Sequence, residues 1–284
     1  MSTDTVRPAS YASRFVEAHG RRLHYLDYGT PGRTPMLCLH GGAAHAHWFD
    51  FVAPGFTSNY HVRALDQRGH GDSAWVQPPA YTYEDYASDL AEVVERLDLR
   101  DFVLVGHSMG GMVALVYAAA HPGRVGRLVV VDTTMRMPEE RLAAMREVGN
   151  RQSRGHATLD EFVARFRLRP PGTSAVPEIV RHLAQNSGRQ TEDGGWRHKF
   201  DRNVYAMRPA LDGVPYWSHI SVPALLVKGA RSERITPQIF AQVQARCPQV
   251  ELAEVAGSDH HVTLDNPAGF VQAVGAFLAK SRTE

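Results

Sequence analysis

The pentapeptide Gly106–Gly110, which reads G-H-S-M-G, is the feature that most constrains how this chain can fold. It follows an apolar run, Phe102–Val105, typical of a buried strand, and it leads into a small, apolar segment, Met109–Ala120, typical of a helix. A strand that turns this abruptly into a helix needs glycine on both sides of the turn, because a side chain there would collide with the returning helix. The pattern therefore predicts a strained turn that presents the Ser108 hydroxyl above a sheet edge.

Strand-like and helix-like segments alternate through most of the chain. Arg22–Tyr28 alternates apolar and polar residues, as an antiparallel strand does. Further short apolar runs are typical of strands buried on both faces, at Pro35–Leu39, His61–Leu65, Leu128–Val131, Ala224–Val227 and Val250–Val255. Helical patterns lie between them, at Tyr83–Leu97 with Thr82 as N-cap, Pro237–Ala245 and Pro267–Ala279. We therefore expect an α/β fold with a mostly parallel, doubly wound sheet.

This alternation stops between Thr133 and Asp212. The stretch holds short amphipathic helical patterns but no convincing buried strand, with helices expected at Glu139–Val148, Leu159–Phe166 and Val176–Gln185. Prolines and glycines at 170–172 and 193–195 interrupt them. We expect a core domain of residues 11–133 and 213–284, with a helical cap of residues 134–212 inserted after the sixth strand. Such a cap would cover the carboxyl edge of the sheet, where open α/β sheets bind ligands.

Composition excludes several classes of function. The 284 residues carry a formal net charge of +1, which favours neither nucleic acid nor a membrane surface as partner. No zinc-ligand spacing, P-loop or dinucleotide motif occurs, so we expect no metal and no organic cofactor. Cys38 and Cys247 imply no disulfide framework, and the polar start of the chain does not resemble a signal peptide. We expect a cytoplasmic protein, and the sequence does not indicate its oligomeric state.

A serine hydroxyl needs an adjacent base to become a nucleophile near neutral pH. The segment Gly257–Val262 lies between the last expected strand and the last expected helix, and it offers His260 and His261. The blocks Leu39–Ala43, Asp66–Ser73, Gly106–Gly111 and His260–Pro267 together resemble the α/β-hydrolase superfamily over nearly the whole chain. In such proteins the catalytic histidine precedes a leucine by four residues in an H-x-x-x-L-D-x-P block, and this register selects His260 here. The Asp66–Ser73 block is expected to be structural.

The resemblance implies an oxyanion hole and an acid. Backbone amides of Met109 and Gly42, with Ala43 as second choice to Gly42, would bind the oxyanion. Two carboxylates follow strands at the right edge. Glu233 stands where the family usually has aspartate, and Asp132 follows the sixth strand, a position that some members use. We favour Asp132, because it follows an apolar run and a buried carboxylate needs a partner such as an imidazole N–H, but both remain candidates.

The expected activity is that of a serine hydrolase acting on a small ester, lactone, amide or carbon–carbon bond next to a carbonyl. Serine at position 108 argues against the dehalogenases and epoxide hydrolases of the family, which place aspartate there. Two alternatives stay open: a cofactor-free dioxygenase that uses the His–acid pair, and a small-molecule receptor. The expected cap is rich in arginine, and we expect Arg146 or Arg167 to bind a carboxylate of the substrate, with Trp48 also lining the pocket.

Overall fold

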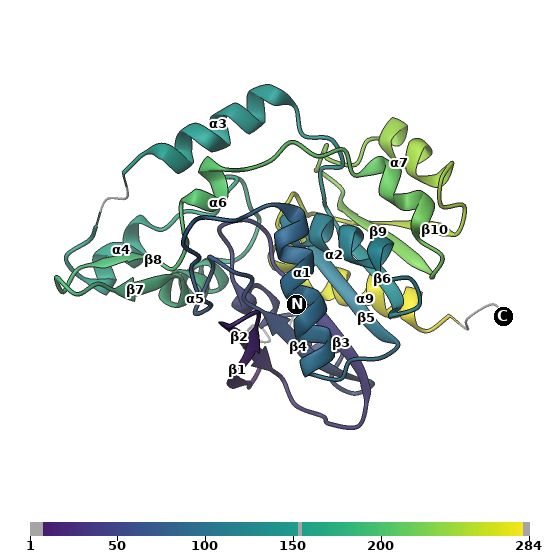
Figure 1. The fold of residues 1–284 in the computed structure, drawn as a ribbon, viewed down its shortest axis with the longest axis horizontal. Helices are drawn as coiled ribbons and strands as arrows, with labels where there is room; N and C mark the ends of the chain where they lie inside the picture. The colour runs from purple at the N-terminus through teal and green to yellow at the C-terminus, as the bar shows by residue number, and fades with distance from the viewer. Residues whose placement is uncertain (1–7, 153–154, 281–284) are drawn as a thin grey trace.

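An eight-stranded sheet forms the centre of the molecule (Figure 1). The structure is a computed structural model that describes residues 8–152 and 155–280. The strand order is β1-β2-β4-β3-β5-β6-β9-β10. β2 pairs antiparallel with β1 and β4, and the other neighbours are parallel. The strands are β1 (Ala12–Ala18), β2 (Arg21–Asp27), β3 (Thr34–Leu39), β4 (Tyr60–Leu65), β5 (Phe102–His107), β6 (Val125–Val131), β9 (Ala224–Gly229) and β10 (Val250–Val255).

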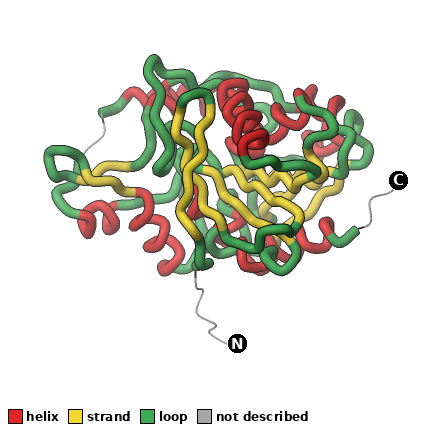
Figure 2. Tube along the Cα trace, turned by 60° about the horizontal axis from the view of Figure 1, so that its bottom comes forward, coloured by secondary structure: helices red, strands yellow, loops and turns green. Residues whose placement is uncertain are grey.

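The mostly parallel, doubly wound sheet predicted from the sequence is confirmed, and helices cover both of its faces (Figure 2). Successive residues of the central strands point to opposite faces, so Leu104 and Val130 join one apolar cluster while Val105 and Val131 join the other. This two-sided burial explains why the strands are continuous apolar runs. Strand β1 was not predicted, because it lies at the sheet edge, is mostly exposed and carries no such run.

The helices flanking the sheet begin where the sequence provides caps. Thr82 and Asp85 form a reciprocal capping box at the start of α1 (Tyr83–Arg96). Helix α2 (Met109–Ala120) is buried along most of its length, consistent with its small, apolar residues. The remaining helices of the core are α7 (Pro237–Gln244), α8 (Val262–Asp265) and α9 (Pro267–Leu278), with 3-10 turns η1 (Ala46–Phe49), η2 (Ala53–Gly55) and η3 (Val214–His219). No helix in the described part of the chain is long and apolar enough to cross a membrane.

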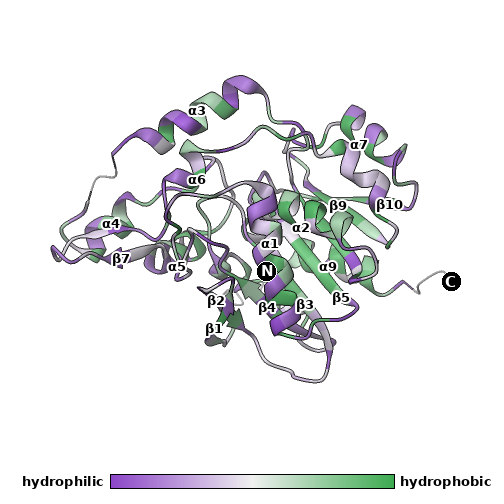
Figure 3. Cartoon of the chain, viewed as in Figure 1, coloured by the Kyte–Doolittle hydropathy of each residue, from purple (hydrophilic) through white to green (hydrophobic). Residues whose placement is uncertain are grey.

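Most of the chain between β6 and β9 lies to one side of the central sheet (Figure 1). The inserted segment expected at residues 134–212 holds α3 (Glu139–Asn150), α4 (Leu159–Arg165), α5 (Pro177–Ser187), β7 (Gly188–Gln190), β8 (Trp196–His198) and α6 (Asn203–Ala206). Its helix α3 is largely hydrophilic (Figure 3), as expected of an element with two buried residues. The hairpin of β7 and β8 was not predicted, because its three-residue strands are mostly exposed and carry no apolar pattern.

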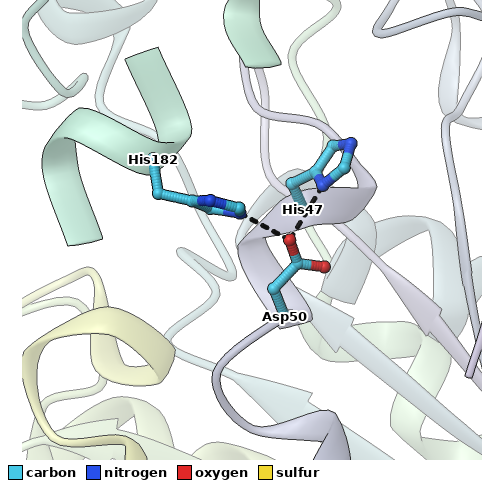
Figure 4. Close-up of side chains that lie close together, drawn as sticks. All are labelled: His47, Asp50 and His182. Atoms are coloured by element: carbon cyan, nitrogen blue, oxygen red, sulfur yellow. Dashed lines mark hydrogen bonds and ion pairs between the residues drawn. The ribbon is translucent and has the colours of Figure 1, made fainter. Parts of the chain in front are cut away.

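A buried polar cluster fastens α5 to the core (Figure 4). His182 of α5 donates to an Asp50 carboxylate oxygen at 2.6 Å, and His47 of η1 donates to the same oxygen at 2.8 Å. The Tyr28 hydroxyl donates to the other oxygen at 2.7 Å. Burial raises the pKa of Asp50, but the hydrogen bonds from His182, His47 and Tyr28 outweigh it, and the pKa lies below its usual value. The charged carboxylate thus joins the core to the inserted segment.

Replacing His182 by alanine should therefore loosen α5. A hydrogen bond to a charged group contributes about 1.5–3 kcal/mol, so we expect a loss of that size in the free energy of unfolding at neutral pH. The pKa of Asp50 is lower in the folded protein than in the unfolded chain. The stability that Asp50 contributes is therefore present above the unfolded pKa of about 4 and is lost as the pH falls through the folded pKa. Urea unfolding and hydrogen exchange across Pro177–Ser187 would measure this. Arg181→Ala, at an exposed neighbouring residue, is the control. An equal loss of stability in that variant would contradict the role of His182 in holding α5 to the core.

Candidate active site

Ser108 occupies a strained turn between β5 and α2. Its φ of 54° and ψ of −113° lie outside the regions that side chains usually adopt. A Cβ on Gly106 would lie 2.3 Å from the Gly110 carbonyl oxygen, and a Cβ on Gly110 would lie 2.4 Å from the Leu39 carbonyl oxygen. Only glycine fits at either position, which is the steric reason for the spacing found in the sequence. The Ser108 amide donates to the Val131 carbonyl at 2.8 Å and so locks the turn onto β6.

Two loops that are distant in sequence bring Asp132 and His260 together. His260 Nδ1 donates to Asp132 Oδ2 at 2.8 Å, and Asp132 is 0% exposed at the end of β6. The Ser232 hydroxyl donates to the same carboxylate oxygen at 2.8 Å, and the Gly229 amide donates to the other at 3.3 Å. His107 Nε2 donates to the His260 carbonyl at 2.8 Å, which anchors the loop that carries the imidazole. The carboxylate therefore fixes the ring tautomer that leaves Nε2 as an acceptor.

The other candidates for acid and base lie elsewhere. Glu233 is exposed and borders a separate surface cavity next to Asp259, and within the described chain it makes no hydrogen bond or ion pair with His260. His261 is buried, but its Nε2 hydrogen-bonds the Pro170 carbonyl at 2.9 Å, so it holds a loop of the inserted segment. The structure thus joins Asp132 with His260, and it joins neither Glu233 nor His261 to that pair.

The environment keeps the His260 ring neutral. Burial lowers the pKa of His260 well below its usual value, and the positive charges of Arg234 and Arg141 act in the same direction. Burial also raises the pKa of Asp132, although Ser232 and Arg234 oppose this. Ser108 and His260 line the same cavity, and no direct hydrogen bond joins these two described side chains. Such bonds are often long in ligand-free sites and tighten when substrate binds.

Two residues that line this cavity have backbone amides without an acceptor among the described residues. Among the described residues, nothing accepts a hydrogen bond from the amides of Gly42 and Met109, and both residues line the cavity with Ser108. Met109 is the first residue of α2, where the helix leaves its amide free and its dipole favours negative charge. Ala43, the second choice from the sequence, has a φ of 59° and borders a neighbouring cavity instead. The cavity wall therefore includes two residues whose backbone donors are unpaired among the described residues.

The Asp66–Ser73 loop supports the turn that carries Gly42. The Gln67 amide donates to His40 Nε2 at 3.0 Å, and the Gln67 side chain donates to the His40 carbonyl at 2.7 Å. Arg68 donates two hydrogen bonds to the Asp89 carboxylate, which ties the loop to α1. These contacts fit the structural role expected from the sequence.

The cavity above Ser108 measures about 230 Å³ and combines an apolar wall with arginines. The apolar wall is formed by residues such as Met112, Met137, Met145 and Val148, together with Tyr83 and Tyr205. Four guanidinium-bearing residues line it, namely Arg141, Arg169, Arg208 and Arg234, and no carboxylate does so within the described ranges. Three of the four belong to the inserted segment, and Arg234 follows β9. The surroundings of Ser108 are therefore strongly cationic.

The residues expected from the sequence to line this cavity lie elsewhere. Arg146 instead donates to the Arg208 carbonyl at 3.0 Å and pairs with Glu139 at 3.6 Å. Arg167 is exposed and caps backbone carbonyls of its own loop, while Trp48 is buried beside a separate cavity of about 50 Å³. The sequence did not show which arginine of α3 points into the cavity. Arg141 and Arg146 point about 140° apart around the helix, and a weakly amphipathic helix does not reveal which of its faces turns inward.

Two groups of side chains have the spacing of metal ligands. One is the cluster of His47, Asp50 and His182 that joins α5 to the core, and the other consists of His24, Asp66 and Asp72. In each group the potential ligand atoms lie within 4.8 Å of one another. In both, a histidine ring hydrogen-bonds a carboxylate, at 2.8 Å for His47 to Asp50 and at 2.7 Å for His24 to Asp66. This is the arrangement of a hydrogen-bond network, and neither group lines the cavity above Ser108.

Comparisons with known proteins identify the family and the fold. The family model described as the alpha/beta hydrolase fold matches residues 34–267. The 2-(acetamidomethylene)succinate hydrolase of Mesorhizobium japonicum is 28% identical and aligns over 86% of this chain and 87% of its own length. Esterase Rv0045c of Mycobacterium tuberculosis is 31% identical over 86% of this chain and 82% of its own.

The likeness extends to solved structures. The crystal structure of E-2-(acetamidomethylene)succinate hydrolase superposes with a TM-score of 0.84 and 26% identity, covering 95% of this chain and 100% of the other. By their names, the two relatives given above are a hydrolase and an esterase, and each aligns over most of this chain. The chain therefore belongs to the α/β-hydrolase superfamily and is a hydrolase of that family.

Proposed function

We propose that the protein is a serine hydrolase in which Ser108, His260 and Asp132 form the catalytic triad for a small, anionic carbonyl substrate. One observation carries this proposal. A fully buried carboxylate, Asp132, holds the His260 ring at 2.8 Å, and that ring shares a cavity with a serine in a strained turn. This is the arrangement that activates a serine hydroxyl in unrelated hydrolases.

The proposed reaction follows from the positions of these groups. His260 Nε2 takes the proton of Ser108 Oγ as that oxygen attacks the carbonyl carbon, and the amides of Gly42 and Met109 bind the oxyanion. Collapse of the tetrahedral intermediate expels the leaving group, which receives the proton from His260, and an acyl-enzyme remains. Water, deprotonated by His260, then releases the acid and restores Ser108. Asp132 stabilises the imidazolium at each step.

The substrate is proposed to be anionic because four arginines line the cavity and no carboxylate does in the part of the chain that is described. Residues 134–212 supply three of them, so we propose that this segment is a cap that selects the substrate. By its name, the relative from Mesorhizobium japonicum hydrolyses a succinate derivative, which supports an ester or amide that bears a carboxylate. Guanidinium groups recognise carboxylates through paired hydrogen bonds.

A pair of matched esters tests this function, one neutral and one with a remote carboxylate. We expect hydrolysis of both, a larger kcat/KM for the anionic ester, and no oxygen consumption. Equal values of kcat/KM would overturn the anionic preference. Oxygen uptake in step with turnover would overturn the hydrolase and favour a dioxygenase that uses the His–Asp pair.

The pH dependence of the reaction should reflect the depressed pKa of His260. His260 can act as a base only when it is neutral. As the pH is lowered, kcat/KM for a neutral ester should therefore stay constant through the ordinary histidine pKa of about 6.5 and fall only at lower pH. Arg234→Met removes a cation that lowers this pKa, so the acid limb should move upward. Arg246→Met, an exposed arginine after α7, should leave it in place. A wild-type acid limb at or above 6.5 would be inconsistent with this environment.

A further inference from the structure

Arg208 is a buried cation without a countercharge. It is 5% exposed, and its Nε is buried without a hydrogen-bond partner. None of the described carboxylates forms an ion pair with it, and its positive charge rests 4.8 Å from the centre of the Tyr83 ring. A cation–π contact offsets only part of the cost of removing a guanidinium from water. Since Arg208 lines the cavity above Ser108, an anion in that cavity would supply the missing countercharge.

A second cation without a partner lies elsewhere in the same cavity. Arg141 of α3 makes no hydrogen bond or ion pair with any described residue. It lies near Arg234, which pairs with Asp132 at 3.3 Å and donates to the Thr134 hydroxyl at 3.2 Å. Burial, together with the nearby charge of Arg141, lowers the pKa of Arg234 to about 10. Asp132 thus forms an ion pair with Arg234, whereas no described carboxylate forms one with Arg141.

The two cations without an ion-pair partner belong to different parts of the cavity wall. Arg208 packs on Tyr83 at the start of α1, which crosses from β4 to β5. Arg141 lies with Arg234 near Asp132, at the ends of β6 and β9. Ser108 follows β5, the strand next to β6 in the sheet, and lines the same cavity as both arginines. Arg169 also lines the cavity, but it is exposed and so can be neutralised by solvent and salt.

We propose that the substrate is a short dicarboxylate derivative, with one carboxylate held by Arg208, the other by Arg141 and Arg234, and the scissile carbonyl at Ser108. This inference rests on the proposed function, because it takes Ser108 as the attacking group. The two negative charges of a dicarboxylate would match the two positive charges of Arg208 and Arg141. The cavity volume of about 230 Å³ also favours a short chain, since sites for drug-sized ligands begin at about 300 Å³.

Binding to the Ser108→Ala protein tests the dicarboxylate subsites without chemistry. Calorimetry would compare succinate with butyrate, which has the same chain length and one carboxylate fewer. We expect succinate to bind roughly 10- to 100-fold more tightly, the size expected for one additional charge-assisted hydrogen-bonded pair. Arg208→Met and Arg141→Met should each remove this preference, and Arg208→Lys, which keeps the charge but loses the fork, should retain part of it. Arg165→Met, on an exposed arginine paired with Glu161, should keep it whole.

Thermal unfolding provides a second readout. Because Arg208 is an unpaired buried charge, Arg208→Met should raise the unfolding temperature of the ligand-free protein and abolish the further rise that succinate causes in wild type. Equal affinity for succinate and butyrate, or a preference that survives Arg208→Met, would overturn the proposal. These outcomes can be distinguished from an error in the proposed function. If the proposed function were wrong, the protein would not hydrolyse a neutral ester through Ser108, but the preference for succinate would remain.

Discussion

Replacing Ser108 by alanine should abolish ester hydrolysis while leaving the fold intact. The change removes only a hydroxyl, yet it removes the attacking atom, so kcat should fall by about six orders of magnitude, as it does when the serine of other triads is removed. Circular dichroism and the unfolding temperature would show that the fold persists. Ser218→Ala, at an exposed serine after β8, is the matched control and should remain fully active. A Ser108→Ala protein with more than about a hundredth of the wild-type rate would require a different nucleophile.

Asp132→Asn and Glu233→Gln should differ by about four orders of magnitude in kcat/KM. Asp132 orients the His260 ring through a 2.8 Å hydrogen bond, and an amide there would favour the wrong tautomer, which costs about 10⁴ in serine proteases. Glu233 is exposed and has no contact with that ring among the described residues, so its variant should behave as wild type.

Steady-state kinetics on one neutral ester measures both acid variants. A mild effect of Asp132→Asn together with a severe effect of Glu233→Gln would reverse the choice of acid. Two mild effects would mean that Ser108 and His260 act as a dyad.

The parts of the site set by local sterics could be predicted from the sequence. Gly106 and Gly110 are needed wherever a helix returns onto the strand it follows, and the distances to Gly110 and Leu39 oxygens show the reason. The buried strands were equally visible, because burial on both faces requires uninterrupted apolar runs. Edge strand β1 and the hairpin of β7 and β8 carry no such requirement, and the sequence does not reveal them.

Contacts between distant segments could be predicted only in part. The sequence favoured Asp132 but kept Glu233, because the choice depends on which carboxylate the loops after β6 and β9 turn toward His260, and either loop sequence allows it. The direction of Arg141, Arg146 and Arg167 depends on how α3 and the following loop rotate above the sheet. Arg208 was missed entirely, because its lack of a countercharge is visible only once the surrounding residues are placed.

Two positioning residues were also missed. His107 stands inside the G-H-S-M-G motif, yet only the structure shows that its ring donates to the His260 carbonyl at 2.8 Å. Ser232 stands next to Glu233, and its hydroxyl donates to Asp132 at 2.8 Å. Both residues contact the backbone or side chain of another residue of the site. Their residue type alone therefore does not indicate in the sequence that they belong to the site.

Labelling with an active-serine phosphonate tests most directly whether Ser108 is the activated nucleophile. The reagent reacts only with a serine that an adjacent base activates, and peptide mass spectrometry locates the adduct. The proposed triad predicts one adduct per chain, on the peptide that contains Ser108, with labelling slowed strongly in Asp132→Asn and absent in Ser108→Ala. An adduct on another residue, or undiminished labelling of Ser108→Ala, would contradict the assignment of Ser108 as nucleophile.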